Sequence, residues 1–66
     1  MHNFTDREIA IIQKIIEGKS YNEIGNDLNI SFHTVKAHIG NIYQKTGFNN
    51  KMLIVVYALQ NNLVKI

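Results

Sequence analysis

Two helical patterns lie close together within residues 20–45, and this pairing constrains the fold more than any other feature of the sequence. In the first pattern, apolar or small residues recur at the i, i+3, i+4 and i+7 positions of one helix face: Tyr21, Ile24, Gly25 and Leu28. In the second, apolar residues recur at i, i+4 and i+7: Val35, Ile39 and Ile42. A short helix, a tight turn and a longer helix predict a helix-turn-helix, which can place its second helix in the major groove of DNA.

Residues typical of helix starts and helix ends flank these patterns. Thr5 and Ser20 are each followed three residues later by a glutamate, the capping-box signature of a helix start, and Ser31 and Asn50 are further N-cap candidates. Residues that tolerate the left-handed conformation stand where helices are expected to end: Gly18, Asn29 and Gly47. The predicted helices cover residues 6–17, 21–28, 32–46 and 51–61. We expect an all-α four-helix bundle that forms one domain over residues 1–66.

The apolar residues of the first and last predicted helices indicate what each one buries. In the first helix the expected core face is Ile9, Ile12, Ile15 and Ile16, with Ile11 on its flank. The last helix has a competing interpretation, because residues 53–59 form a continuous apolar run that could be a buried strand. We favour a helix, since the flanking residues resemble caps and no other segment could pair with a strand.

The last predicted helix carries two apolar faces. One can cover the core: Ile54, Val55 and Ala58. The other again follows i, i+3, i+4 and i+7 spacing: Leu53, Val56, Tyr57 and Gln60. In so small a chain a second apolar face suggests a partner, and we expect a homodimer through this helix. The alternative is that part of the face packs under the N-terminal residues or against a neighbouring domain.

The charged residues are unevenly distributed. All five acidic residues lie within residues 1–27 together with three basic ones, so this part has a net charge of −2. Residues 29–66 contain four lysines and no acid, so they have a net charge of +4. The asymmetry favours a polyanionic partner such as nucleic acid for the second half, although chance in a short chain could also produce it.

The composition argues against several other classes of protein. The absence of cysteine excludes disulfides and thiolate metal sites and suits a reducing, cytoplasmic setting. No apolar run approaches the roughly 20 residues of a membrane span, and the N-terminus is too short and polar for a signal peptide. His33 and His38 are five residues apart, roughly 140° around a helix, so they do not share a face. We expect no metal, no cofactor and no catalytic site.

Four motifs occur at defined spacing: FTDRE (residues 4–8), GKSYNEI (18–24), ISFHTVKAH (30–38) and NIYQKTG (41–47). Over roughly residues 4–64 this combination resembles the LuxR/NarL/GerE-type DNA-binding domain. The resemblance implies a four-helix bundle with a helix-turn-helix in its second and third helices, dimerisation through the fourth, and a role in bacterial transcription regulation. It also implies that a receiver or sensor domain can precede the chain, although a few members stand alone at about this length.

The sequence departs from the family pattern at a few positions. Members often have Ala at Gly25 and Glu at Leu53, and usually Arg at Lys51 and Gly at Asn62. Gly40 matters most, because it lies on the expected groove-facing side, where members commonly have a basic or polar residue. Glycine inside a helix costs up to about 1 kcal/mol relative to alanine, so close approach of the backbone is one reason to have it there.

The start of the predicted recognition helix supplies the candidate DNA contacts. Lys36 can donate to guanine O6 and N7, and Ala37 can contact a thymine methyl group. Thr34 and His38 suit phosphates, as the resemblance also implies, and the N-termini of both helices offer free backbone N–H groups. The full set of expected DNA contacts is Lys19, Ser20, Tyr21, Ser31, Phe32, Thr34, Lys36, Ala37, His38, Gly40, Asn41, Lys45 and Lys51.

Each candidate contact also has a structural interpretation. Lys36 could be a solvated lysine, His38 could bond to a backbone group, and Lys45 could complement a helix C-terminus. Arg7 and Glu8 are expected to be structural, through capping and pairing. The alternative function for the whole chain is a helical protein-interaction module that docks through its last helix. Binding to random duplex DNA at low salt would separate that alternative from DNA binding.

Overall fold

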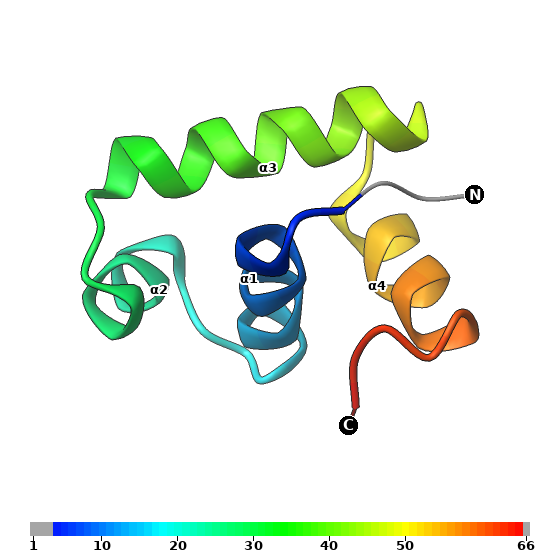
Figure 1. Cartoon of the computed structure of the whole chain (residues 1–66), viewed down its shortest axis with the longest axis horizontal. Coiled ribbons are helices and arrows are strands. Elements are labelled where there is room, and N and C mark those ends of the chain that lie inside the picture. The colour runs from blue at the N-terminus through cyan, green and yellow to red at the C-terminus, as the bar shows by residue number, and fades with distance from the viewer. Residues whose placement is uncertain (1–3, 66) are drawn as a thin grey trace.

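Four helices make up the fold. A computed structural model of the chain describes residues 4–65. Its helices are α1 (Asp6–Ile16), α2 (Tyr21–Leu28), α3 (Phe32–Thr46) and α4 (Lys51–Gln60). α1 lies in the centre, between α2 and α4, and α3 runs across all three (Figure 1). Residues 4–65 contain no strand, so the all-α prediction is confirmed, and the helical interpretation of residues 53–59 is correct.

Side-chain caps determine where the helices begin. The Thr5 hydroxyl accepts a hydrogen bond from the Glu8 backbone N–H at 3.1 Å, and the Glu8 carboxylate accepts one from the Thr5 N–H at 2.9 Å. Ser20 and Glu23 form the same reciprocal pair at the start of α2, at 3.1 and 2.8 Å. The bonds that Glu23 exchanges with Ser20 lower the pKa of its carboxyl. Both predicted capping boxes are confirmed, which explains why the predicted starts match the observed ones.

Left-handed residues end the helices where the sequence predicted. Asn29 has φ +59° after α2, Gly47 has φ +75° after α3, and Gly18 has φ +84° after α1. Asn62, where family members usually have glycine, also has positive φ, at +58°. Asparagine tolerates this conformation better than most residues with a side chain, so the chain can turn sharply here without glycine.

The core consists of two clusters, one on each side of α1. On the α2 side, α1 contributes Ile11, which packs with Ile24, Val35 and Ile39. On the α4 side it contributes Ile12, which packs with a second apolar set: Ile42, Ile54, Ala58 and Val64. Ile11 is fully buried, so its predicted position on a flank is wrong. The reason is tertiary: a helix with neighbours on both sides buries a wider arc than a helix on a surface.

The segment after α4 folds back onto α1. Val64 joins the core cluster on the α4 side. The Gln13 amide donates to the Lys65 carbonyl at 2.6 Å and accepts from the Lys65 N–H at 2.9 Å. These contacts span 52 residues of sequence and fasten the end of the chain to the central helix. Packing and hydrogen bonds therefore both anchor the C-terminal segment to α1.

Candidate nucleic-acid interface

The turn between α2 and α3 holds the two helices close together. The Ile30 N–H donates to the Gly25 carbonyl at 2.9 Å, which folds the turn back onto α2. A Cβ at Gly25 would stand 2.7 Å from the Ile30 carbonyl oxygen, closer than real Cβ contacts come. Gly25 therefore has to be small, and the contact that requires this lies in the turn itself. This close turn sets the angle at which α3 leaves α2.

The first residues of α2 and α3 lie side by side. The rings of Tyr21 and Phe32 are 6.3 Å apart between centroids, although 11 positions separate them in sequence. Ser31 caps α3 by accepting from the Thr34 N–H at 3.0 Å, and the two hydroxyls are hydrogen-bonded at 2.9 Å. Two helix N-termini with exposed caps therefore face the same region. Free N–H groups at helix N-termini can bind anions, so this region suits the phosphate contacts that the sequence predicts.

Two lysines from different helices join this aromatic pair. Lys36 Nζ lies 5.5 Å from the centroid of the Phe32 ring, and Lys51 Nζ lies 5.3 Å from that of Tyr21. The rings of His33 and Phe32 are 5.8 Å apart between centroids, in a T-shaped arrangement. We call these five residues the aromatic–basic cluster. It brings together four predicted contacts from α2, α3 and α4, and the sequence analysis considered its fifth member, His33, only as a metal ligand.

Burial also affects the chemistry of this cluster. Burial raises the pKa of the Tyr21 phenol above its usual 10.0, with a smaller contribution from Tyr43. The phenol is a hydrogen-bond donor at neutral pH, as any tyrosine is. Phe32 is 39% exposed, so its ring lies at the surface. Its ring supports the Lys36 ammonium from one turn earlier, a cation–π contact worth about 0.5–1 kcal/mol at an exposed site. The contact orients Lys36 without neutralising it.

The outward face of α3 is polar and free of acid. Val35, Ile39 and Ile42 are buried against the other helices. Exposed residues run along the whole opposite side of the helix, from its first turn to its last: His33, Thr34, Lys36, Ala37, Gly40, Asn41, Gln44 and Lys45. His38 is half-buried at the edge of this face. A duplex lying along α3 would meet only neutral or cationic groups.

Lys45 differs from the other predicted contacts. Its ammonium is 2.7 Å from the Glu8 carboxylate, whose side chain is only 3% exposed. Burial alone raises the pKa of Glu8, but the bonds from Lys45 and from the Thr5 N–H, with the charges of Lys45 and His38, hold it below 4.5. The pair joins the last turn of α3 to the first turn of α1. Lys45 therefore has a structural partner that the sequence did not indicate, and Glu8 is structural as expected.

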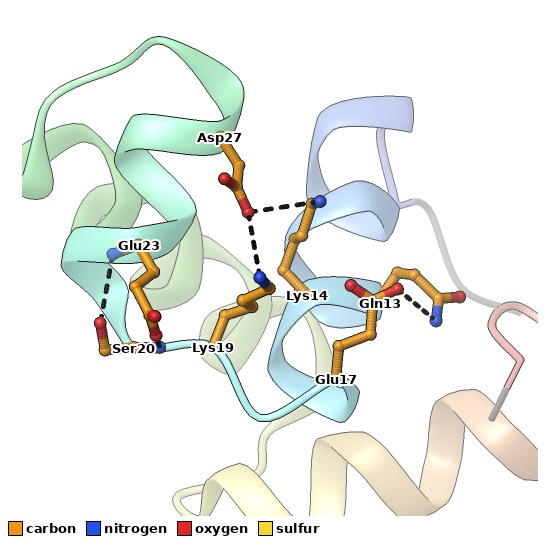
Figure 2. A network of polar contacts seen from close by, with 7 residues as sticks. All are labelled: Gln13, Lys14, Glu17, Lys19, Ser20, Glu23 and Asp27. Carbon is orange, nitrogen blue, oxygen red and sulfur yellow. Dashed lines mark hydrogen bonds and ion pairs between the residues drawn. The ribbon is translucent and has the colours of Figure 1, made fainter.

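Lys19 lies in a polar network between α1 and α2 (Figure 2). The ammonium groups of Lys14 and Lys19 converge on Asp27, at 3.4 and 3.9 Å from the same carboxylate oxygen. Arg7 also connects the two helices, by donating to the Leu28 carbonyl at 3.4 Å. Such exposed pairs are worth about 0–1 kcal/mol, so Lys19 can exchange Asp27 for a phosphate at little cost.

The predicted dimer face of α4 divides into two parts. Leu53 is 46% exposed and Val56 41% exposed, and Gln60 is also exposed. Tyr57 is half-buried. Its ring makes T-shaped contacts with the rings of Phe4 and Phe48, at centroid distances of 6.2 and 5.8 Å. For Tyr57 the alternative interpretation therefore applies, because its ring packs against Phe4, which precedes α1. Leu53 and Val56 form an apolar strip on the surface, and the exposed polar side chain of Gln60 continues it.

A groove on the other side of α4 was not indicated by the sequence. Its volume is about 440 Å³. The lining comes from the end of α1, the loop after it, and α4: Ile15, Ile16, Gly18, Lys19, Lys51, Met52, Val55 and Leu59.

Residues 4–65 contain no cluster of three or more His, Cys, Asp or Glu that could hold a metal ion. No helix among them has the length and apolarity needed to cross a membrane.

Known proteins are similar to this chain in sequence and in fold. Residues 2–58 match the family model described as "Bacterial regulatory proteins, luxR family". The transcriptional regulatory protein LiaR of Bacillus subtilis is 44% identical over 62 residues, which are 94% of this chain and 29% of that protein. DegU of Brevibacillus brevis is 39% identical over 66 residues, all of this chain and 28% of that one. The chain therefore spans about three tenths of the length of these relatives.

A solved structure extends the similarity to three dimensions. The response regulator ChrA of a heme-sensing two-component system superposes with a TM-score of 0.86 at 35% sequence identity. The match covers 96% of this chain and 31% of that one. The four-helix arrangement described above therefore also occurs in ChrA, where it makes up about three tenths of the chain.

Proposed function

This chain belongs to the LuxR family of bacterial regulatory proteins, and from that premise we propose that it binds double-stranded DNA in a sequence-specific manner. α3 would enter the major groove with its exposed face. The observation that carries the proposal is the acid-free outer face of α3, with the N-termini of α2 and α3 side by side at one end of it. Phosphate contacts would supply much of the affinity and make it salt-dependent.

Different residues would have different roles in this complex. Lys36, held over Phe32, would read a base edge, and Ala37 would contact a thymine methyl group. The remaining proposed contacts, Gly40 apart, would bind phosphates or position the helix: Lys19, Ser20, Tyr21, Ser31, Phe32, Thr34, His38, Asn41, Lys45 and Lys51. For Lys45 the ion pair with Glu8 favours positioning, since its ammonium is already engaged.

We further propose that the chain acts as a dimer on a two-fold symmetric site. Leu53, Val56 and Gln60 form an exposed strip on α4, which a second copy could cover across a two-fold axis. Selection of duplexes from a random-sequence library should then enrich an inverted repeat. Recovery of a single half-site would argue for a monomer, and no enrichment would contradict sequence-specific binding.

Lys36→Ala tests the assignment of base readout. It should weaken binding to the selected duplex by about 1–3 kcal/mol and change binding to random duplex much less. The matched control is Lys65→Ala, which removes the same charge from an exposed residue near the C-terminal end, away from α3 (Figure 1). Affinity for both duplexes can be measured by gel shift. Equal losses on both would make Lys36 a phosphate contact.

A protein-interaction module remains the second candidate function, favoured by the apolar groove between α1 and α4. Titration of salt against binding to random duplex separates the two functions. Affinity at low salt that falls steeply as salt rises supports DNA binding.

We also propose that a receiver domain accompanies this chain, because the matched relatives are about three times as long and include response regulators. The flanking coding sequence tests that proposal.

A further inference from the structure

Gly40 has no evident purpose within the folded chain. Its backbone is helical, without the positive φ that favours glycine. Apart from its two chain neighbours and the backbone of α3 itself, no atom of the described residues lies within 4 Å of the place where a Cβ would stand. Gly25 is the contrast, because a Cβ there would meet the Ile30 carbonyl at 2.7 Å. The free protein would thus accept a side chain at position 40 and would gain helix stability from it.

The position of Gly40 on α3 indicates that the glycine serves a contact with another molecule. It is exposed, lies one turn after Lys36 and three residues after Ala37, and so shares their face of the helix. A bare backbone at this point lets a flat or convex surface come closer to the helix axis than any side chain would allow. In the middle of a 15-residue helix, such a gap costs stability in the free protein.

We propose that Gly40 is a specificity-determining position, at which the backbone of α3 lies in van der Waals contact with the base edges of the major groove. This inference rests on the proposed DNA binding. An added Cβ would stand ~1.5 Å from the Cα and would need about 3.5–4 Å to the nearest base atom. The helix would have to move outward, and Lys36, one turn away, would lose hydrogen-bond geometry to its base.

Gly40→Ala tests the inference on two independent readouts. The melting temperature should rise by up to about 8 °C, because alanine is the better helix former. Affinity for the duplex selected with the wild-type chain should fall on the order of tenfold, about 1.4 kcal/mol. Affinity for random duplex should fall less, since it depends mainly on phosphate contacts. Gly40→Lys should also weaken binding to the selected duplex, despite its added charge.

Several outcomes would overturn the inference. If Gly40→Ala binds the selected duplex as well as wild type does, the backbone makes no close contact there, although the proposed function would stand. Tighter binding by Gly40→Lys would mean that the position is open in the complex. A lower melting temperature for Gly40→Ala would show that the glycine serves the free fold. If the wild-type chain selects no sequence at all, the proposed function fails first and this inference fails with it.

Discussion

At the scale of single residues, the buried Glu8 carboxylate connects stability to the position of α3. Glu8 caps α1 through the Thr5 N–H and binds the Lys45 ammonium, so one side chain joins a helix start to the end of another helix. Removing one partner of a buried pair costs more than the pair itself contributes, because the remaining charge stays buried. We therefore expect substitutions at Glu8 to destabilise the fold. Any loss of DNA binding would follow from that loss of stability.

The low pKa of Glu8 makes this contribution depend on pH. Because its pKa is lower in the folded chain than the unfolded value of 4.5, the stabilisation is present above pH 4.5. It is lost as the pH falls through the folded-state pKa. Glu8→Gln should lower the free energy of unfolding by about 1–3 kcal/mol at pH 7, and its difference from wild type should shrink below pH 4.5.

Urea unfolding at several pH values measures this effect. The matched control is Glu17→Gln, which changes an exposed carboxylate at the end of α1 and should change stability little at any pH. A constant difference between Glu8→Gln and wild type from pH 7 to pH 3 would mean that the charge of Glu8 does not stabilise the fold.

At the scale of helices, features set by local interactions could be predicted from the sequence, and features set by tertiary contacts could not. Helix starts and ends were predicted to within one residue, because Thr5, Ser20 and Asn29 act on backbone groups a few positions away. The burial of Ile11 and the engagement of Lys45 were not predicted. Both depend on neighbours that only the packed structure brings close, and the Lys45 partner is 37 residues away.

The candidate site divides in the same way. The polar face of α3 follows from its periodicity, so its residues were predictable. The contact of Lys51 with Tyr21 was not, because it joins α4 to the start of α2. His33 was overlooked as part of this surface, although its position in the first turn of α3 beside Phe32 was a usable signal.

The turn between α2 and α3 should be intolerant of bulk. Gly25→Val would place a branched side chain against the Ile30 carbonyl, where even a Cβ stands 2.7 Å away. We expect a loss of about 1–3 kcal/mol of stability, as for other overpacked core positions. Gly40→Val is the matched control, because its Cβ meets open space. Denaturant unfolding compares the two variants, and equal stabilities would contradict the tight turn.

At the scale of the whole molecule, the fold presents different surfaces for different tasks. The aromatic–basic cluster and the outer face of α3 lie along one side, where α2 and α3 begin. The exposed strip of α4 carries Leu53 and Val56 and leaves Tyr57 packed against Phe4. A dimer formed through this strip would leave both copies of α3 free, which two-fold symmetric recognition of DNA requires.

Val56→Glu tests the dimer. Two glutamates would approach each other across the two-fold axis, so binding to an inverted repeat should weaken on the order of tenfold or more. Binding to a single half-site should be unchanged. Met52→Glu is the matched control, since it adds the same charge to a more exposed residue of α4 outside the proposed strip. If both variants bind the inverted repeat equally well, α4 does not form the dimer through Val56.

The most direct test of DNA binding through α3 is a titration of the ¹⁵N-labelled chain with the selected duplex, followed by amide chemical shifts. The largest changes should fall on residues 31–41 and on residues 19–21 at the start of α2. The α4 residues that line the groove with α1, Val55 and Leu59, should change little. Changes concentrated on that groove, with the amides of α3 unaffected, would contradict the proposed interface.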